Sequence, residues 1–444
     1  MATVTVDQAK LVLNSFAAIF QNNLVSRDLV TWKKFDGEMN DRNGLEVVEQ
    51  VTPDYTTSFT TNGVADLSGG VQDTTFGSER FKLDQTINSS MGWGDFVKIR
   101  DIGSARESQA LRKAALRLAT DVDTYIMKFV TLAPNNWLGD GSTSVSTWDD
   151  IASAYTRLKE EGCDDADLRA VLTYGDRQAL GSDIIGDNAS LTDLGEGTYR
   201  RGFDGMVAGI PTMFTQQLPA FSVGTRDASG ADVETDYGSG DPENLYEDVA
   251  ISPAPGQYMT GLLDLTVSAA GTETVKEGET FTIAGVYAWD NRAKKQLDHL
   301  QVFRVVGGTG SDGMNGGTYT AVSGAISNMR YFPAIIVSGP FQTVVNTNGG
   351  GATWDDLAIT FKGAASATLH PRVIANKDAV IVNTADLILP ATGKGSRVSL
   401  TKVPLSVRMW QDSIFATGEH RIRFDVGIKA NVVDRRRAVR INGS

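Results

Sequence analysis

Hydrophobic positions near the start of the chain follow a helical period. The apolar residues of one face are separated by three, four and four positions: Leu13, Phe16, Phe20 and Leu24. This pattern predicts an amphipathic helix over residues 7–30, with Asp7 as a candidate cap. A helix at the end of a chain needs a surface to lie on, in its own subunit or in a neighbour.

The strongest helical pattern covers residues 104–133. Ser104 and Glu107 have the spacing of a capping box, and Pro134 is expected to stop the helix. Six apolar residues recur at intervals of four and three and form one stripe: Leu111, Ala115, Leu118, Val122, Tyr125 and Phe129. At 1.5 Å per residue this helix would be roughly 45 Å long, which predicts a strut across a domain.

The polar segment 44–100 between these helices has a strand-like pattern instead. Its run RFKLDQTI alternates, with one side formed by Phe81, Leu83 and Ile87 and the other by Lys82, Asp84 and Thr86. We predict a long two-stranded arm. An isolated hairpin is marginal in water, so the arm must pack on something else, and Phe81, Lys82, Leu83 and Asp84 are its candidate assembly contacts.

Later segments combine both periods. Residues 148–221 predict an α/β region with one helix ended by Gly162 and two strands, RAVLTY and MVAGIPTMF. Residues 275–306 predict two strands, ETFTIAGVYA and HLQVFRVV, and β-type patterning continues to about residue 345. Near the C-terminus LSVRM and RIRFDVGI alternate on either side of ATGE, which predicts a hairpin.

Composition and charge narrow the class of protein. The chain has 444 residues, 46 of them Gly, and a net charge of −13 from 54 acidic and 41 basic residues. This balance argues against a protein that wraps nucleic acid over its whole surface. A single cysteine, Cys163, excludes an internal disulfide. We expect neither a membrane span nor a signal peptide, and therefore a protein made in a cytoplasm.

Two segments concentrate charge. Residues 222–256 are acidic and loop-like, and include Asp236, Asp241, Glu243 and Asp248. Such a loop could bind a cation, but a solvated loop or one paired with a basic partner surface is the better prediction. The last residues are basic: Arg435, Arg436, Arg437 and Arg440.

No residue pattern indicates chemistry. The three histidines, His299, His370 and His420, lack the short spacing of a zinc site. GGTGSDGM at 307–314 fits one turn of a calcium-binding repeat and also G-x-G-x-x-G, but it has neither further copies nor a following helix, so a glycine-rich hairpin loop is predicted. GKGS at 393–396 lacks the residues of a phosphate loop. We therefore predict no enzyme and no catalytic, cofactor or metal site.

The order of these parts resembles one family, the major capsid proteins of tailed double-stranded DNA phages. The branch is the short-tailed Salmonella-phage type, whose coat protein has an insertion domain. SARESQALRKAALRLATDVDTYIM is similar to the family's spine helix, and RRGFDGMVAGIPTMFTQQLP to the segment that leads into the insertion. VKEGETFTIAGV and LQVFRVV resemble the insertion's β core, and VIANKDAVIVNTADLILP the return segment, with Asn376 where members often have His.

The resemblance implies an α+β fold of the Johnson, Hong-Kong-97-like type. Its implied parts are an N-terminal helical arm (1–43), an extended loop (44–100), a peripheral domain with the spine helix (101–147), an axial domain (148–222), an inserted barrel-like β domain that faces outward (223–345) and a return through both domains (346–444). The implied partners are copies of the chain in hexamers and pentamers, scaffolding protein, portal, decoration protein and enclosed double-stranded DNA. The implied location is the virion capsid, assembled in the bacterial host cytoplasm.

Two other functions stay open at this stage. A tail or adhesion component that binds glycan predicts exposed aromatic clusters in residues 260–345, where Tyr287 and Trp289 are the close pair. A hydrolase with a β accessory module predicts an activity that depends on one of the histidines.

Overall fold

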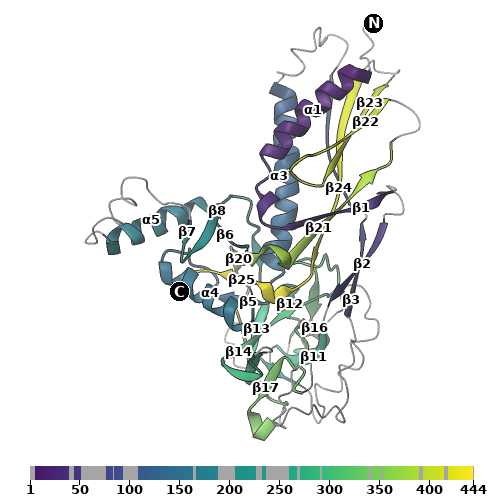
Figure 1. Cartoon of the computed structure of the whole chain (residues 1–444). Helices are drawn as coiled ribbons and strands as arrows, with labels where there is room; N and C mark the ends of the chain where they lie inside the picture. The colour runs from purple at the N-terminus through teal and green to yellow at the C-terminus, as the bar shows by residue number, and fades with distance from the viewer. Residues whose placement is uncertain are drawn as a thin grey trace, which may run out of the picture. The chain divides into compact units, whose positions relative to one another are not determined.

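The computed structural model of the chain describes residues 6–39, 45–51, 77–83, 85–93, 109–163, 167–188, 206–226, 233–236, 260–267, 271–290, 293–338, 342–351, 354–389, 394–414 and 419–443. The chain divides into two compact units that alternate along the sequence (Figure 1). One comprises residues 1–47, 81–129 and 377–432, and the other comprises residues 48–80, 130–376 and 433–444. Among the described helices, none is long and apolar enough to cross a membrane.

The N-terminal helix α1 (Val6–Asn22) ends eight residues earlier than the pattern predicts. A 3-10 turn, η1 (Ser26–Asp28), follows it. The physical reason is Asp123, whose carboxylate accepts the backbone N–H groups of Val25 and Ser26 at 2.9 and 3.0 Å and so removes them from a continuing helix. The predicted apolar face is nevertheless correct, because all four of its members are buried: Leu13, Phe16, Phe20 and Leu24.

The sheet of the first unit is six-stranded and is built from segments far apart in sequence. Its order is β1 (Thr31–Met39), β21 (Val380–Leu387), β24 (Glu419–Val432), β23 (Ser406–Ile414) and β22 (Lys394–Ser399), with β4 (Thr86–Trp93) also paired to β24. The antiparallel β23–β24 pair confirms the predicted C-terminal hairpin. Helix α1 packs on this sheet, with the ring of Phe16 stacked on that of Phe424 at a centroid distance of 3.8 Å.

The predicted arm strand RFKLDQTI is divided in two. Among the described strands, β3 (Gly77–Leu83) pairs only with β2 (Leu45–Val51), whereas β4 begins at Thr86 and joins the larger sheet. Leu83 is fully buried against Ala385 and Leu387. The alternation is real, but the residues before and after position 84 belong to different sheets.

The second unit contains a mixed sheet in the order β5 (Asn136–Leu138), β25 (Ala438–Ile441), β20 (Arg372–Asn376), β6 (Leu168–Leu172), β8 (Ile210–Phe214) and β7 (Met206–Val207). The run MVAGIPTMF forms two strands instead of one, because Ala208 and Gly209 both have positive φ angles, of 50° and 77°, and turn the chain between β7 and β8.

Two helices lie between these strands in sequence, α4 (Trp148–Glu160) between β5 and β6 and α5 (Tyr174–Asn188) between β6 and β7. Helix α4 starts at a capping box formed by Thr147 and Asp150. It ends as the sequence predicts: Gly162 has a φ angle of 80°, and Gly162 and Cys163 donate backbone hydrogen bonds to the carbonyls of Lys159 and Leu158.

A β module lies between these elements in sequence. Its strands are β10 (Glu234–Thr235), β11 (Gly261–Thr266), β16 (Ala325–Phe332), β14 (Lys295–Val305), β13 (Thr280–Asp290), β17 (Val344–Asn346) and β18 (Ile359–Phe361). The antiparallel β13–β14 pair matches the two strands predicted at residues 275–306. Backbone hydrogen bonds from Thr235 to Leu357 and from Ile359 to Val233 connect the first strand to the last.

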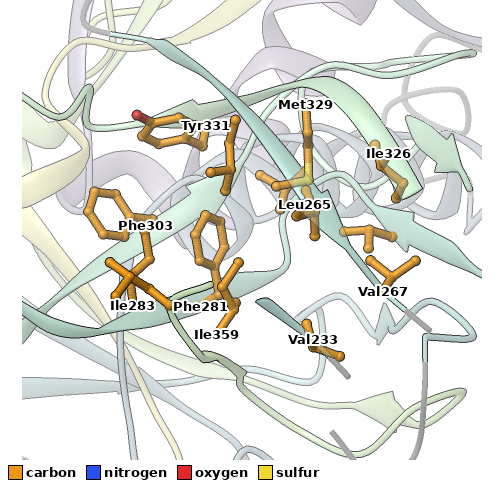
Figure 2. Close-up of a cluster of buried hydrophobic side chains, with 14 of the residues drawn as sticks. Val233, Leu265, Val267, Phe281, Ile283, Phe303, Ile326, Met329, Tyr331 and Ile359 are labelled. Carbon is orange, nitrogen blue, oxygen red and sulfur yellow. The ribbon is translucent and has the colours of Figure 1, made fainter. Parts of the chain in front are cut away.

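The module has its own hydrophobic core (Figure 2). The rings of Phe281 and Phe303 lie 5.5 Å apart, and Tyr331 meets both of them edge-on. Non-aromatic apolar side chains surround these rings, and seven of them are labelled: Val233, Leu265, Val267, Ile283, Ile326, Met329 and Ile359. The remaining short pairs are β9 (Phe221–Ser222) with β19 (Thr368–Leu369), and β12 (Thr274–Lys276) with β15 (Thr318–Thr320).

Candidate functional site

The long helix α3 (Gln109–Leu132) contains the predicted stripe. The first four of its members are fully buried: Leu111, Ala115, Leu118 and Val122. Tyr125 and Phe129 are half-buried, and the fully buried positions in this half are instead Ile126, Met127 and Val130. The buried face therefore continues one residue later than predicted in its second half. The predicted capping box at residues 104–107 lies outside the described residues.

The residues predicted for the arm and for the acidic loop lie in several places. Phe81 and Lys82 lie in β3, Leu83 is buried at the end of that strand, and Asp84 lies outside the described residues. Asp236 is exposed directly after β10. Asp241, Glu243 and Asp248 lie outside the described residues, so the acidic loop stays a prediction.

The histidines do not converge. His299 Nδ1 lies 3.3 Å from Glu160 Oε2, and His370 is exposed. Across the described residues, no three His, Cys, Asp or Glu side chains form a group that could hold a metal ion.

Three arginines gather instead at the C-terminal end of α3, and we call this group with its acceptors the arginine junction. Arg304 donates from Nε to the Leu132 carbonyl at 2.9 Å. Arg440 donates from Nη2 to the carbonyls of Leu132 and Pro134, at 2.7 and 2.8 Å. Arg435 donates from Nη1 to the Ala133 carbonyl at 3.2 Å. The carbonyl groups at a helix C-terminus lack intrahelical partners and have negative partial charge, so cations stabilise them.

The same guanidinium groups connect this helix end to the β module. Arg440 Nη1 donates to the Gly278 carbonyl at 2.9 Å, and Arg304 Nη2 donates to those of Gly313 and Met314 at 3.2 and 3.1 Å. The Arg440 guanidinium also lies over the rings of Trp137 and Phe221, at 4.9 and 5.5 Å from their centroids. The junction thus joins the helix end, strand β14 and two turns of the module region, and the C-terminal strand β25.

The surroundings of the junction disfavour the positively charged forms of Arg304 and Arg440. Burial lowers the pKa of Arg304 well below its ordinary value, and the neighbouring Arg435 and Arg440 lower it further. Burial, and then Arg435, lower the pKa of Arg440 from its ordinary value to about 9. Arginine stays protonated in proteins, so this part of the molecule holds two buried positive charges.

The loop GGTGSDGM lies beside the junction and is ordered by two carboxylates. Buried Glu277 accepts hydrogen bonds from the backbone of Gly307 and Gly317 at 3.0 Å and from the Ser311 hydroxyl at 2.9 Å. Asp312 accepts three further backbone N–H groups within the loop. The glycine-rich segment is therefore a turn held by its own chain, as the sequence predicts.

Sequence reasoning missed the junction. It treated Arg440 as one of several basic residues at the C-terminus, whereas Arg440 is fully buried. Its acceptors are backbone carbonyls, and because every residue has one, the sequence does not show which carbonyls accept these hydrogen bonds. The one available signal was the apolar surroundings of Arg304 in QVFRVV and of Arg440 in AVRI.

Comparison with known proteins identifies the family. The family described as "P22 coat protein - gene protein 5" matches residues 1–439. The chain belongs to the P22 coat protein family. It is accordingly a major capsid protein, which assembles with its own copies into the shell of a phage.

Several solved phage structures are similar to this chain at low identity. "Capsid structure of the Cyanophage P-SCSP1u" is 10% identical, with a TM-score of 0.45, and the match covers 95% of this chain and 88% of the other. "Capsid of Ralstonia phage GP4" is 8% identical, with a TM-score of 0.43 and coverages of 96% and 91%. "Mycobacterium phage Che8" is 12% identical, with a TM-score of 0.40 and coverages of 91% and 87%. No curated protein matches the sequence.

Membership of the coat protein family decides between the functions that the sequence left open. It confirms the resemblance to tailed-phage major capsid proteins and, with it, the predicted α+β capsid fold. Tyr287 and Trp289, the pair that a glycan-binding function would need exposed, are both half-buried in β13. A structural coat protein is also consistent with the prediction that the chain is not an enzyme.

Proposed function

We propose that the chain builds its shell as hexamers and pentamers, through contacts made by a β arm and by the long helix α3. The observation that carries this proposal is the separate two-stranded sheet of β2 and β3, which joins no other described strand. A pair of strands is marginal in water without further packing. A neighbouring subunit is the surface that a repeating shell offers at this position in every copy.

The proposal extends to the roles implied for the other parts. The β module with strands β10 to β18 is the inserted domain and faces outward, and its acidic loop contacts a neighbouring capsomer. Exposed Asp236 supports this placement because it belongs to the acidic segment and directly follows β10, the edge strand of the module. The division into peripheral and axial domains follows the ranges given by the resemblance.

The partners proposed for assembly are a scaffolding protein, a portal, a decoration protein and enclosed double-stranded DNA. Assembly takes place in the bacterial host cytoplasm, and the chain performs no catalysis. The net charge of −13 supports this arrangement, since a negative wall does not hold a polyanion that must be packed and released.

Deletion of residues 62–76 from the full-length chain tests the arm. This change keeps β2 and β3, so the subunit should fold with a normal circular dichroism spectrum, but it should not form closed shells in electron micrographs. A control variant replaces the same residues with a Gly/Ser segment of equal length and separates the effect of contacts from that of length. Normal shells from both variants would exclude a role for this segment in assembly.

A further inference from the structure

The chain keeps its buried arginines in two different environments. In the described part of the chain, five arginines are no more than 6% exposed: Arg226, Arg304, Arg372, Arg408 and Arg440. Three of them meet a carboxylate. Arg226 pairs with Glu279, Arg372 with Asp176 at 2.9 and 3.0 Å, and Arg408 with Asp425 at 2.7 and 3.0 Å. Buried charges are normally paired in this way.

Arg304 and Arg440 are the exceptions, and both are 0% exposed. All their hydrogen bonds go to backbone carbonyls, and neither forms an ion pair with a carboxylate of the described residues. Glu277 and Asp312 favour the charge of Arg304 from a distance, while their oxygens accept hydrogen bonds from the glycine-rich loop. The two guanidinium groups share the Leu132 carbonyl, so like charges lie side by side.

Within the part of the chain that the structure describes, each guanidinium also has one nitrogen without a hydrogen-bond partner. Arg304 Nη1 and Arg440 Nε are buried and unbonded, and so are the hydroxyls of Thr131 and Thr280 in the same region. Thr280 stands opposite Arg304 in the β13–β14 register, which brings their Cβ atoms to about 5 Å. These four groups can all donate. A fifth unbonded atom, Asn135 Oδ1, is an acceptor and suits a water molecule instead.

We propose that the arginine junction binds one small monovalent anion, of the size of chloride, between Arg304 Nη1 and Arg440 Nε. The anion would supply the counter-charge that carboxylates supply to the other three buried arginines. It would also accept the unpaired N–H groups, since unsatisfied buried donors are rare in folded proteins and usually indicate a water or an ion. Both donor atoms are buried, which favours a single-atom ion over phosphate or sulfate, because these larger ions need more space and more donors.

The anion would stabilise the folded subunit wherever it binds the native state alone. Its site forms only when β14, β25 and the C-terminal end of α3 come together, so the unfolded chain has no equivalent. Once chloride exceeds its dissociation constant, each tenfold rise in chloride should lower the ratio of unfolded to folded protein tenfold. The inference concerns the isolated subunit and does not rest on how shells assemble.

Equilibrium unfolding of the unassembled full-length chain tests the site. Urea midpoints are measured in sodium chloride and in sodium gluconate at the same ionic strength, so that general screening is equal. We expect a higher midpoint in chloride, with a difference that grows with salt concentration. Coincident midpoints in the two salts across the series would overturn the proposal.

Two variants assign the effect to the junction. Thr280→Val removes one donor with little change of shape, and should weaken the chloride dependence several-fold while the chain still folds. The matched control is Arg372→Lys, which disturbs a buried arginine that already has a carboxylate. It should lower the midpoint equally in both salts and preserve the difference between them. An unchanged chloride effect in Thr280→Val together with its loss in Arg372→Lys would place the anion elsewhere.

Crystals of the full-length chain grown in sodium bromide provide a direct readout. Bromide scatters anomalously and water does not. We expect an anomalous peak within hydrogen-bond distance of both Arg304 Nη1 and Arg440 Nε. Ordinary density without an anomalous signal there would show that water satisfies these groups, and the proposal would be wrong.

Discussion

At the residue scale, single buried charges hold together segments that are remote in sequence. Arg372 and Asp176 illustrate this: the Asp176 carboxylate accepts two N–H groups of Arg372 and also the hydroxyl and backbone N–H of Thr173, at 2.7 and 2.8 Å. The Asp176 carboxylate thus accepts four hydrogen bonds, and a buried ion pair is tolerated when further hydrogen bonds of this kind satisfy it. The pair fixes strand β20 to the start of α5.

Substitution of one partner should therefore be costly. Arg372→Met keeps the apolar stem but leaves Asp176 buried and without its counter-charge, which should lower the free energy of unfolding by about 3–5 kcal/mol. Urea unfolding followed by tryptophan fluorescence measures this loss. The double variant Arg372→Met with Asp176→Leu serves as the control and should recover much of it. A loss below about 1 kcal/mol in the single variant would contradict a buried, charged pair.

Asp434 caps the 3-10 turn Arg435–Arg437, and its protonation makes stability depend on pH. Its carboxylate accepts from the backbone and side chain of Arg436, at 3.0 and 3.2 Å, and burial is outweighed so that its pKa lies below the ordinary value of 3.8. A carboxyl group with a depressed pKa in the folded state stabilises that state above the unfolded pKa, and this contribution is lost as the pH falls through the folded pKa.

Asp434→Asn should remove that contribution. We expect the difference in unfolding free energy between wild type and variant to be constant near neutral pH and to shrink as the pH falls below 3.8. Unfolding curves at a series of pH values measure it. A difference that widened on acidification would mean that the folded pKa of Asp434 is raised instead.

At the element scale, helix α3 depends on its buried stripe. Leu118→Asp places a carboxylate at a position that is fully buried and has no basic partner in the stripe, which costs several kcal/mol. We expect insoluble protein in a cell lysate. Thr124→Asp, on the exposed face of the same helix, is the matched control and should change stability by no more than about 0.5 kcal/mol. Soluble, assembling Leu118→Asp protein would contradict the packing of this helix.

The same helix shows how far sequence reasoning extends. Periodicity locates α3, the four buried stripe residues of its first half and its end before Pro134, because these depend on local geometry. It misplaces Tyr125 and Phe129, since only the neighbouring elements decide whether position 125 or 126 faces inward. The division of MVAGIPTMF escapes prediction for a related reason: Ala208 adopts a positive φ angle that its residue type does not favour.

Long-range arrangements are less predictable than elements. The pairing of β4 with β24, or of β20 with β25, joins segments whose sequences contain no mutual signal. The arginine junction is the extreme case, because its acceptors are carbonyl groups. The structure gives positions only for those candidate assembly residues that it describes, and their role in contacts between subunits stays a prediction.

At the scale of the whole molecule, the net charge of −13 sets the ease of assembly. Subunits with the same sign of charge repel one another as they associate, and salt shortens the range of that repulsion from about 10 Å at 0.1 M to about 3 Å at 1 M. We therefore expect the critical concentration for shell formation to fall as ionic strength rises. Light scattering measures the critical concentration at increasing concentrations of sodium gluconate, so that ionic strength rises while the chloride concentration stays constant. A critical concentration that rises with salt would instead indicate attraction between oppositely charged surfaces.

The alternation of the two units along the sequence has a consequence for biosynthesis. Strands β1 and β4 leave the ribosome early, but β21 and β24, the strands that complete their hydrogen bonding, are translated only near the end of the message. Translation proceeds at about 5–20 residues per second, so the edges of β1 and β4 stay unpaired for on the order of tens of seconds. During that interval β1 or β4 can pair incorrectly with a strand of another nascent chain on the same polysome. A cell that makes many copies at once therefore has to keep nascent chains apart.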